Sequence, residues 1–186
     1  EPFKPAVEGA NLRGMLERWG VTLAECAQPG IFSQKRILMV PGLNHNGLAE
    51  ALAQRGAAIR YADPLVYFGL PDVPGVGSRH ALAQAAGPTL EQLKQAPFRL
   101  LMPRPGASSS PLGAGAFAWA DILAGDIGAI RRYAPGILRH KTVVVESATE
   151  EDLADLRRRG VAIVVELLSS IVPGAGMSTW SAAATE

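Results

Sequence analysis

The residues with the clearest potential for chemistry lie in a turn bounded by two glycines. Residues 37–40 are continuously apolar, and the turn after them covers residues 41–47. Backbone N–H groups in such a turn, with the positive end of the following helix, can bind a phosphate. Asp63 follows Gly42 by 21 positions, near the roughly 20-residue spacing of the acid that binds a ribose hydroxyl. The pattern predicts a nucleotide site with these cofactor contacts: Gly42, Asn44, Asn46, Gly47 and Asp63.

The turn departs from the known phosphate-binding patterns. The dinucleotide fingerprint is G-x-G-x-x-G, whereas this turn has G-x-x-x-x-G with Asn44 at the middle glycine. It also lacks the Gly-Lys-Ser/Thr ending of a P-loop. If a dinucleotide does bind, Asp63 favours NAD over NADP, because an acid repels the additional phosphate. An ordinary strand-to-helix turn with a capping acid is the alternative, and a different ligand is the third reading.

Polar residues also follow later predicted strands. Asp126 comes after the apolar residues 122–125, either as a helix N-cap or as a ligand. Ser147 and Thr149 follow the predicted strand over residues 142–145. Parallel strands end at one edge of a sheet, where doubly wound proteins bind ligands. These side chains are therefore further ligand candidates.

Other titratable residues carry weaker signals. Arg132 can bind a carboxylate or phosphate as a fork, although a solvated charge at a helix end is the simpler interpretation. His45 titrates near neutral pH and suits a general base or a phosphate donor, but the sequence favours a solvent-facing loop histidine. No two histidines have metal-ligand spacing, so we expect no zinc site. Lys141 precedes a strand, at the end opposite to the expected site, and no general base is identified.

The elements that position these residues alternate between strands and helices. Strands are predicted over residues 36–40, 58–62, 122–125, 142–145 and 161–165, and helices over 47–55, 127–133 and 150–159. Thr149 is a suitable N-cap and Gly160 a suitable stop for the last helix. The alternation predicts an α/β fold, a doubly wound and mostly parallel sheet with helices on both faces (Rossmann-like).

The flanking and intervening segments are less regular. Apolar residues at helical spacing predict a helix over residues 7–19 that stops at Gly20, with an inward face of Leu12, Met15, Leu16 and Trp19. All three tryptophans are expected to be core anchors. Residues 64–118 contain eight prolines, which exclude long elements, and residues 105–115 are predicted to form a mobile surface loop. We expect a helix and linker over residues 1–34, as the remnant of a longer amino-terminal part, and a Rossmann-like domain over 35–182.

Composition narrows the classes of partner. The chain is 48% hydrophobic and 19% charged with a formal net charge of +1, which is typical of a globular protein and disfavours nucleic acid binding. Cys26 is the only cysteine, so no internal disulfide can form, which fits a cytoplasmic protein. No apolar segment reaches the roughly 20 residues that span a bilayer. We expect a small-molecule substrate, and the sequence is compatible with a homo-oligomer.

Four groups of segments, taken together, carry a family resemblance. They are residues 37–40 with 47–52, residues 61–65 with 68–71, residues 120–126 with 130–135, and residues 141–145 with 149–153 and 159–161. Together they resemble the small bacterial proteins named quinate 5-dehydrogenase, over about residues 7–182. The resemblance implies NAD(P)-linked oxidation of a cyclic polyol acid such as quinate or shikimate, with the nucleotide-binding turn and Asp63 as cofactor contacts.

The resemblance leaves the catalytic part of such an enzyme unassigned. The lysine and aspartate motifs that shikimate dehydrogenases proper carry in a separate substrate domain are not found in this chain. The chain is therefore expected to be an oxidoreductase of this type or only its cofactor-binding part. The alternative is a non-catalytic doubly wound domain that binds a nucleotide, a small acid or a partner protein.

Overall fold

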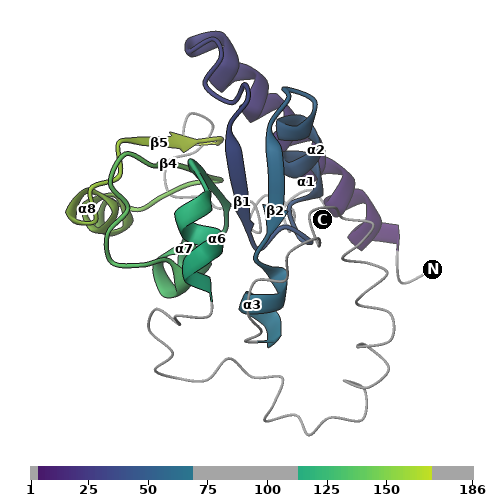
Figure 1. Ribbon diagram of the computed structural model, residues 1–186. Coiled ribbons are helices and arrows are strands. Elements are labelled where there is room, and N and C mark those ends of the chain that lie inside the picture. The colour runs from purple at the N-terminus through teal and green to yellow at the C-terminus, as the bar shows by residue number, and fades with distance from the viewer. Residues whose placement is uncertain (1–3, 69–112, 169–186) are drawn as a thin grey trace, which may run out of the picture.

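The computed structural model describes residues 4–68 and 113–168, with side chains described for residues 12–67 and 113–168. Its centre is a parallel sheet in the order β2-β1-β3-β4-β5 (Figure 1). The strands are β1 (Arg36–Val40), β2 (Ala58–Tyr61), β3 (Ile122–Gly125), β4 (Thr142–Val145) and β5 (Ile163–Glu166). The predicted doubly wound α/β fold is confirmed, although β5 begins two residues later than predicted.

The strand order changes direction between β1 and β3. From β1 the chain first adds β2 on one side of the sheet and then adds β3, β4 and β5 in turn on the other. The register is level across the centre, because Val40 pairs with Gly125 and Gly125 pairs with Val145. The carboxyl ends of β1, β3 and β4 therefore meet at one edge, at the topological switch point where doubly wound sheets bind ligands.

Helices cover both faces of the sheet because its central strands are apolar on both sides. On one face, Ile37 and Met39 of β1 pack in a core with Val21 of α1 (Lys4–Ala27) and Leu52 of α2 (Asn46–Ala53). On the other, Leu38 and Val40 pack in a second core. That core is completed by residues of α3 (Asp63–Phe68), α6 (Ala114–Trp119), α7 (Ile127–Tyr133) and α8 (Glu150–Arg158).

Helix α1 differs from its prediction in both length and orientation. It continues through Gly20 to Ala27. Gly20 is buried, and an added Cβ would lie 2.7 Å from the Cβ of Leu167, so this glycine permits close packing and does not end the helix. Met15 is 60% exposed and Trp19 is 49% exposed, whereas Glu17 is 1% exposed. The predicted inward face is therefore wrong at Met15 and at Trp19, which is not a core residue, whereas Leu16 packs against the core as predicted. Over its described part, the helix packs the side that carries Gly14, Glu17 and Gly20 against the rest of the protein.

The proline-rich segment is helical at both of its described ends. α3 begins at Asp63 and has Pro64 in its first turn, where a proline costs no hydrogen bond. α6 begins at Ala114. The prediction of irregular structure over residues 64–118 is wrong at these two places. Residues 105–112 of the predicted loop, and Trp180, lie outside the described residues.

The helix ends on the carboxyl side of the sheet confirm two predicted caps. Asp126 accepts a hydrogen bond from the Ala129 N–H at 2.7 Å, as the N-cap of α7. Thr149 and Asp152 form a reciprocal capping box at the start of α8. Among the described residues, no helix combines the length and apolarity that a membrane crossing requires.

Candidate functional site

The turn after β1 is held in shape by Asp63. Its two carboxylate oxygens accept hydrogen bonds from the Gly42 N–H and the Leu43 N–H, both at 2.8 Å. Asp63 is 1% exposed. Burial raises the pKa of this carboxyl, and the bonds from Leu43 and Gly42 oppose the rise. The 21-residue spacing thus places an acid against the turn itself. Contact between Asp63 and a ribose stays a prediction, and it requires the turn to open because the carboxylate is buried.

Both glycines of the turn are explained by close packing within the protein. A Cβ on Gly42 would lie 2.2 Å from a ring carbon of Tyr61, and one on Gly47 would lie 2.4 Å from the Gly14 carbonyl oxygen. Neither neighbour leaves room for a side chain, so the glycines are required without any ligand. Asn44 is exposed and donates a hydrogen bond from its amide to the Tyr67 hydroxyl at 2.9 Å. Cofactor contacts from these residues and from Asn46 stay predictions.

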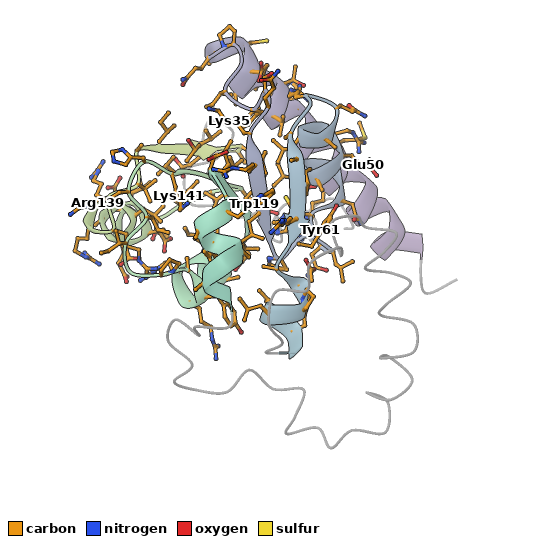
Figure 2. The ribbon with its side chains drawn as sticks, in the orientation of Figure 1. Lys35, Glu50, Tyr61, Trp119, Arg139 and Lys141 are labelled. Atoms are coloured by element: carbon orange, nitrogen blue, oxygen red, sulfur yellow. The ribbon has the colours of Figure 1, made fainter. Side chains whose placement is uncertain are left out.

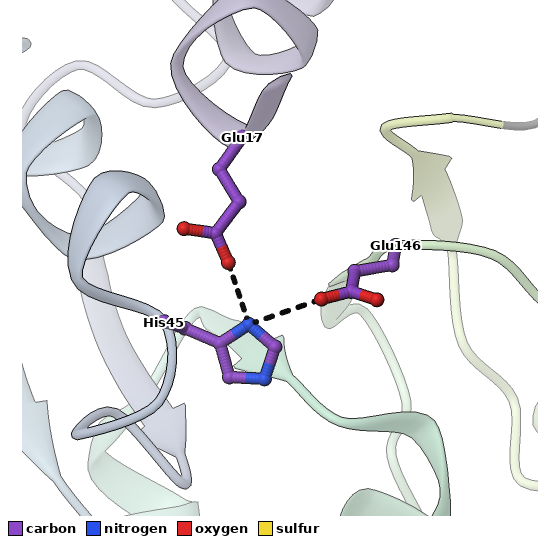
Figure 3. Close-up of side chains that lie close together, drawn as sticks. All are labelled: Glu17, His45 and Glu146. Atoms are coloured by element: carbon purple, nitrogen blue, oxygen red, sulfur yellow. Dashed lines mark hydrogen bonds and ion pairs between the residues drawn. The ribbon is translucent and has the colours of Figure 1, made fainter. Parts of the chain in front are cut away.

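His45 lies in this turn and is buried, so the expectation of a solvent-facing histidine is wrong. Its side chain is 3% exposed. Its Nδ1 atom lies 2.8 Å from Oε1 of Glu17 and 3.6 Å from Oε1 of Glu146. Figure 3 shows the two carboxylates approaching the same ring nitrogen from different sides, with the second ring nitrogen turned away. Within the part of the chain that the structure describes, this second nitrogen makes no hydrogen bond.

Glu17 connects α1 to the start of α2. Its Oε2 atom accepts a hydrogen bond from the Leu48 N–H at 3.0 Å, in the first turn of α2. The amino terminus of a helix stabilises negative charge through its free N–H groups and its dipole. A carboxylate of the protein therefore occupies the position that the sequence predicts for a phosphate.

Arg13 completes the group of interacting side chains. Its Nη2 atom donates to Oε1 of Glu146, and its Nε atom lies 3.7 Å from Oε1 of Glu17. That Nε atom is buried and has no hydrogen-bond partner among the described residues. We refer to Arg13, Glu17, His45 and Glu146 as the acid–imidazole cluster. Its members come from α1, from the turn after β1 and from the residue after β4.

Most of this cluster is not among the site residues that the sequence predicts. Glu146 could be found as a polar residue directly after a strand, and His45 was recognised as titratable. Arg13 and Glu17 lie on a helix whose inward face was assigned from bulky apolar residues alone. The available signal was their spacing, because Arg13, Glu17 and the buried Val21 succeed one another at four-residue steps along α1.

Of the remaining predicted site residues, three lie at the carboxyl edge of the sheet and Arg132 lies away from it. Asp126 is exposed at the carboxyl end of β3, and Ser147 and Thr149 follow β4 at the same edge. Arg132 lies in the last turn of α7, about 8 Å along the helix axis from its first residue, and its guanidinium lies 5.5 Å from the Tyr133 ring centroid. The fold therefore does not bring it to the strand ends.

Lys141 lies at the amino end of β4 (Figure 2), as predicted. Its ammonium group donates a hydrogen bond to the Ala120 carbonyl, and burial lowers its pKa. Because the expected site is at the opposite edge, these contacts give Lys141 a structural role.

The carboxyl edge of the sheet carries an acid after or at the end of each of four strands: Asp63, Asp126, Glu146 and Glu166. Carboxylates of the protein also bond the first turns of three of the described helices that start here, with Glu17 at α2, Asp126 at α7 and Asp152 at α8. Carboxylate oxygens accept hydrogen bonds from hydroxyl groups and coordinate cations. The edge can therefore bind hydroxyl-bearing or cationic groups, and a phosphate must compete with an existing carboxylate for the start of α2.

Comparison with known proteins places the chain in a family without a described activity. No curated protein matches the sequence. Among solved structures, the hetero-hexameric glutamate dehydrogenase from Thermus thermophilus in its leucine-bound form matches with a TM-score of 0.45 and 15% identity. The match covers 94% of this chain but 39% of that chain. The fold assignment does not depend on this match, because it follows from the strand order described above. Residues 11–177 match the profile of a domain of unknown function, DUF8754, and the chain belongs to that family.

Proposed function

We propose that the chain binds NAD, or a closely related nucleotide, at the carboxyl edge of its sheet, as the cofactor domain of an NAD(P)-linked oxidoreductase. The observation that carries this proposal is the level register of Val40, Gly125 and Val145. It brings the polar turn, Asp126 and the residues after β4 to one edge at the switch point between β1 and β3. Doubly wound proteins bind nucleotides at this position.

The charges of this edge indicate how such a nucleotide would be recognised. Exposed Asp126 is available to accept hydrogen bonds from ribose hydroxyls. The acids at this edge also disfavour the additional phosphate of NADP, so NAD is the expected form. The pyrophosphate would replace Glu17 at the Leu48 N–H, since this is the helix terminus that follows β1.

The substrate class comes from the resemblance to quinate 5-dehydrogenases. A bound nicotinamide would accept a hydride from the carbon that carries a ring hydroxyl of a cyclic polyol acid. The same acid-rich edge suits a substrate with several hydroxyl groups, because each carboxylate can accept from them. The hydroxyl carbon would become a carbonyl carbon as the hydride leaves, and the hydroxyl proton would pass to water, so the proposal covers the cofactor part of this reaction.

A second candidate function is a non-catalytic domain that binds a small ligand other than a dinucleotide. The observation in its favour is that Asp63 and Glu17 already use three N–H groups that a phosphate would need, those of Gly42, Leu43 and Leu48. A ligand without phosphate would leave these contacts intact.

A thermal-shift titration with NAD, NADP, AMP and quinate separates the two candidates. NAD at about 100 times its dissociation constant should stabilise the folded chain by roughly 2.7 kcal/mol, with a smaller shift for NADP. Glu17→Gln, which removes the competing charge at the start of α2, should bind NAD more tightly than the wild type. A shift with quinate alone would support the second candidate, and the absence of any shift with millimolar NAD would overturn the first.

A further inference from the structure

The acid–imidazole cluster has the composition of a metal site. Its imidazole nitrogen and two carboxylate oxygens lie within 4.8 Å of one another, and two of the three donors belong to buried residues. The separations from Nδ1 of His45 are 2.8 Å to Glu17 and 3.6 Å to Glu146. Ligands at about 2.1 Å from a shared metal, at tetrahedral or octahedral angles, are roughly 3.0–3.4 Å apart. Both separations from Nδ1 are therefore close to ligand–ligand distances, and the two carboxylate oxygens, within 4.8 Å of each other, can converge on the same ion.

The guanidinium of Arg13, the cation of this cluster, does not use all of its hydrogen-bond donors. Arg13 is the basic side chain that contacts both carboxylates, yet its buried Nε atom has no hydrogen-bond partner among the described residues. One imidazole proton can bond only one of the two carboxylates that approach Nδ1. The Arg13 side chain is 30% exposed, so it can turn toward solvent and leave its position to another cation.

The donor set also meets two further requirements of a metal site. A ligating carboxylate is usually held by an outer hydrogen bond, and the Leu48 N–H supplies one to Oε2 of Glu17 while Oε1 faces His45. An imidazole with carboxylates suits Zn²⁺, Mn²⁺, Fe²⁺ or Co²⁺ better than Ca²⁺ or Mg²⁺. Three protein ligands leave a coordination position for water or substrate, as in catalytic zinc sites.

We propose that Glu17, His45 and Glu146 bind one divalent transition-metal ion, which displaces the guanidinium of Arg13 from Glu146. His45 would bind through Nδ1 in its neutral form. The expectation of no zinc site was based on spacing between histidines, and this site has a single histidine with two carboxylates from distant parts of the chain. The proposal does not depend on nucleotide binding.

The test is equilibrium dialysis of the full chain against Zn²⁺ with elemental analysis, together with the visible absorption spectrum of the Co²⁺ complex. We expect one equivalent of metal in the wild type and at least about tenfold weaker binding in Glu146→Gln and His45→Gln. Arg13→Gln should bind more tightly than the wild type, because it removes the competing cation. His140→Gln changes an exposed loop histidine and should bind like the wild type.

The variants keep the test decisive if one of them is unstable. Should His45→Gln fail to fold, Glu146→Gln and Arg13→Gln decide the outcome, because both side chains are partly exposed. Absence of bound metal in both the wild type and Arg13→Gln would overturn the proposal. Equal losses in Glu146→Gln and His140→Gln would also overturn it, since the metal would then be held by surface side chains. Neither of these two results would bear on nucleotide binding, which the thermal titration with NAD tests separately.

Discussion

At the scale of single residues, Asp63 shows how a correct spacing can have more than one physical cause. Its position relative to Gly42 is that of a ribose-binding acid, and its carboxylate instead bonds the Gly42 and Leu43 N–H groups. Two neighbouring N–H groups in a tight turn need an acceptor whether or not a ligand is present. The buried Asp63 meets that need, so its first role is to fix the turn.

Asp63→Asn should destabilise the fold by about 1–3 kcal/mol, because an amide presents a donor to one of the two N–H groups and leaves it unsatisfied. The measurement is urea denaturation at pH 7. Asp126→Asn is the matched control, since Asp126 is an exposed N-cap and asparagine caps a helix about as well as aspartate. Equal stabilities of the two variants would show that the Asp63 bonds do not support the turn.

At the scale of elements, β1 and β3, the two strands that flank the switch point, are joined at their amino ends by hydrogen bonds between Asp121 and Arg36. Asp121 accepts hydrogen bonds from the Arg36 N–H at 3.0 Å and from its guanidinium Nη2 at 2.7 Å. Bonding to Arg36 lowers the pKa of Asp121 to about 2. This contact joins the start of β1 to the residue before β3.

Asp121 should make stability depend on pH in the acid range. Because its pKa is lower in the folded chain than in the unfolded chain, its contribution is complete above the unfolded value near 3.8 and is lost as pH falls toward 2. Urea midpoints measured from pH 5 to pH 2.5 should fall less steeply in Asp121→Asn than in the wild type. Parallel curves for the two proteins would contradict this assignment.

The contact between α1 and α2 depends on a pair of glycines. A Cβ on Gly47 would lie 2.4–2.5 Å from backbone atoms of Gly14, which cannot move without separating the helices. Gly47→Ala should cost about 1–3 kcal/mol of stability, measured by thermal or urea unfolding. Gly115→Ala is the matched control, because nothing lies within 4 Å of its added Cβ in α6. A loss in Gly115→Ala as large as in Gly47→Ala would contradict the close-packing explanation.

Sequence patterns predicted the elements whose causes are local. β3 and β4 are short apolar runs, and Asp126 and Thr149 cap helices that begin one residue later. The bulky apolar residues of α1 do not reveal its orientation, because small residues decide it through partners elsewhere in the chain. The acid–imidazole cluster joins residues 28 positions apart at Glu17 and His45, and 133 apart at Arg13 and Glu146, so no local pattern describes it.

At the scale of the whole molecule, the fold gathers polar groups at one edge of the sheet and fills that edge with the chain's own carboxylates. The strand order fixes where a ligand should bind, and the acids restrict what it can be. A hydroxyl-rich nucleotide with its phosphates at α2 must displace Glu17, whereas a metal ion would displace Arg13. The two proposed ligands therefore make different demands on α1, which supplies both residues.

An NMR titration of the isotopically labelled full chain with NAD tests whether a nucleotide binds at the carboxyl edge of the sheet. We expect amide resonances to change at the turn of residues 41–47, around Asp126 and over residues 146–149, and NADP to produce smaller changes. Resonances at the amino edge, around Lys35 and Lys141, should stay constant. An unchanged spectrum at millimolar NAD, or changes confined to the amino edge, would contradict a nucleotide site at the switch point between β1 and β3.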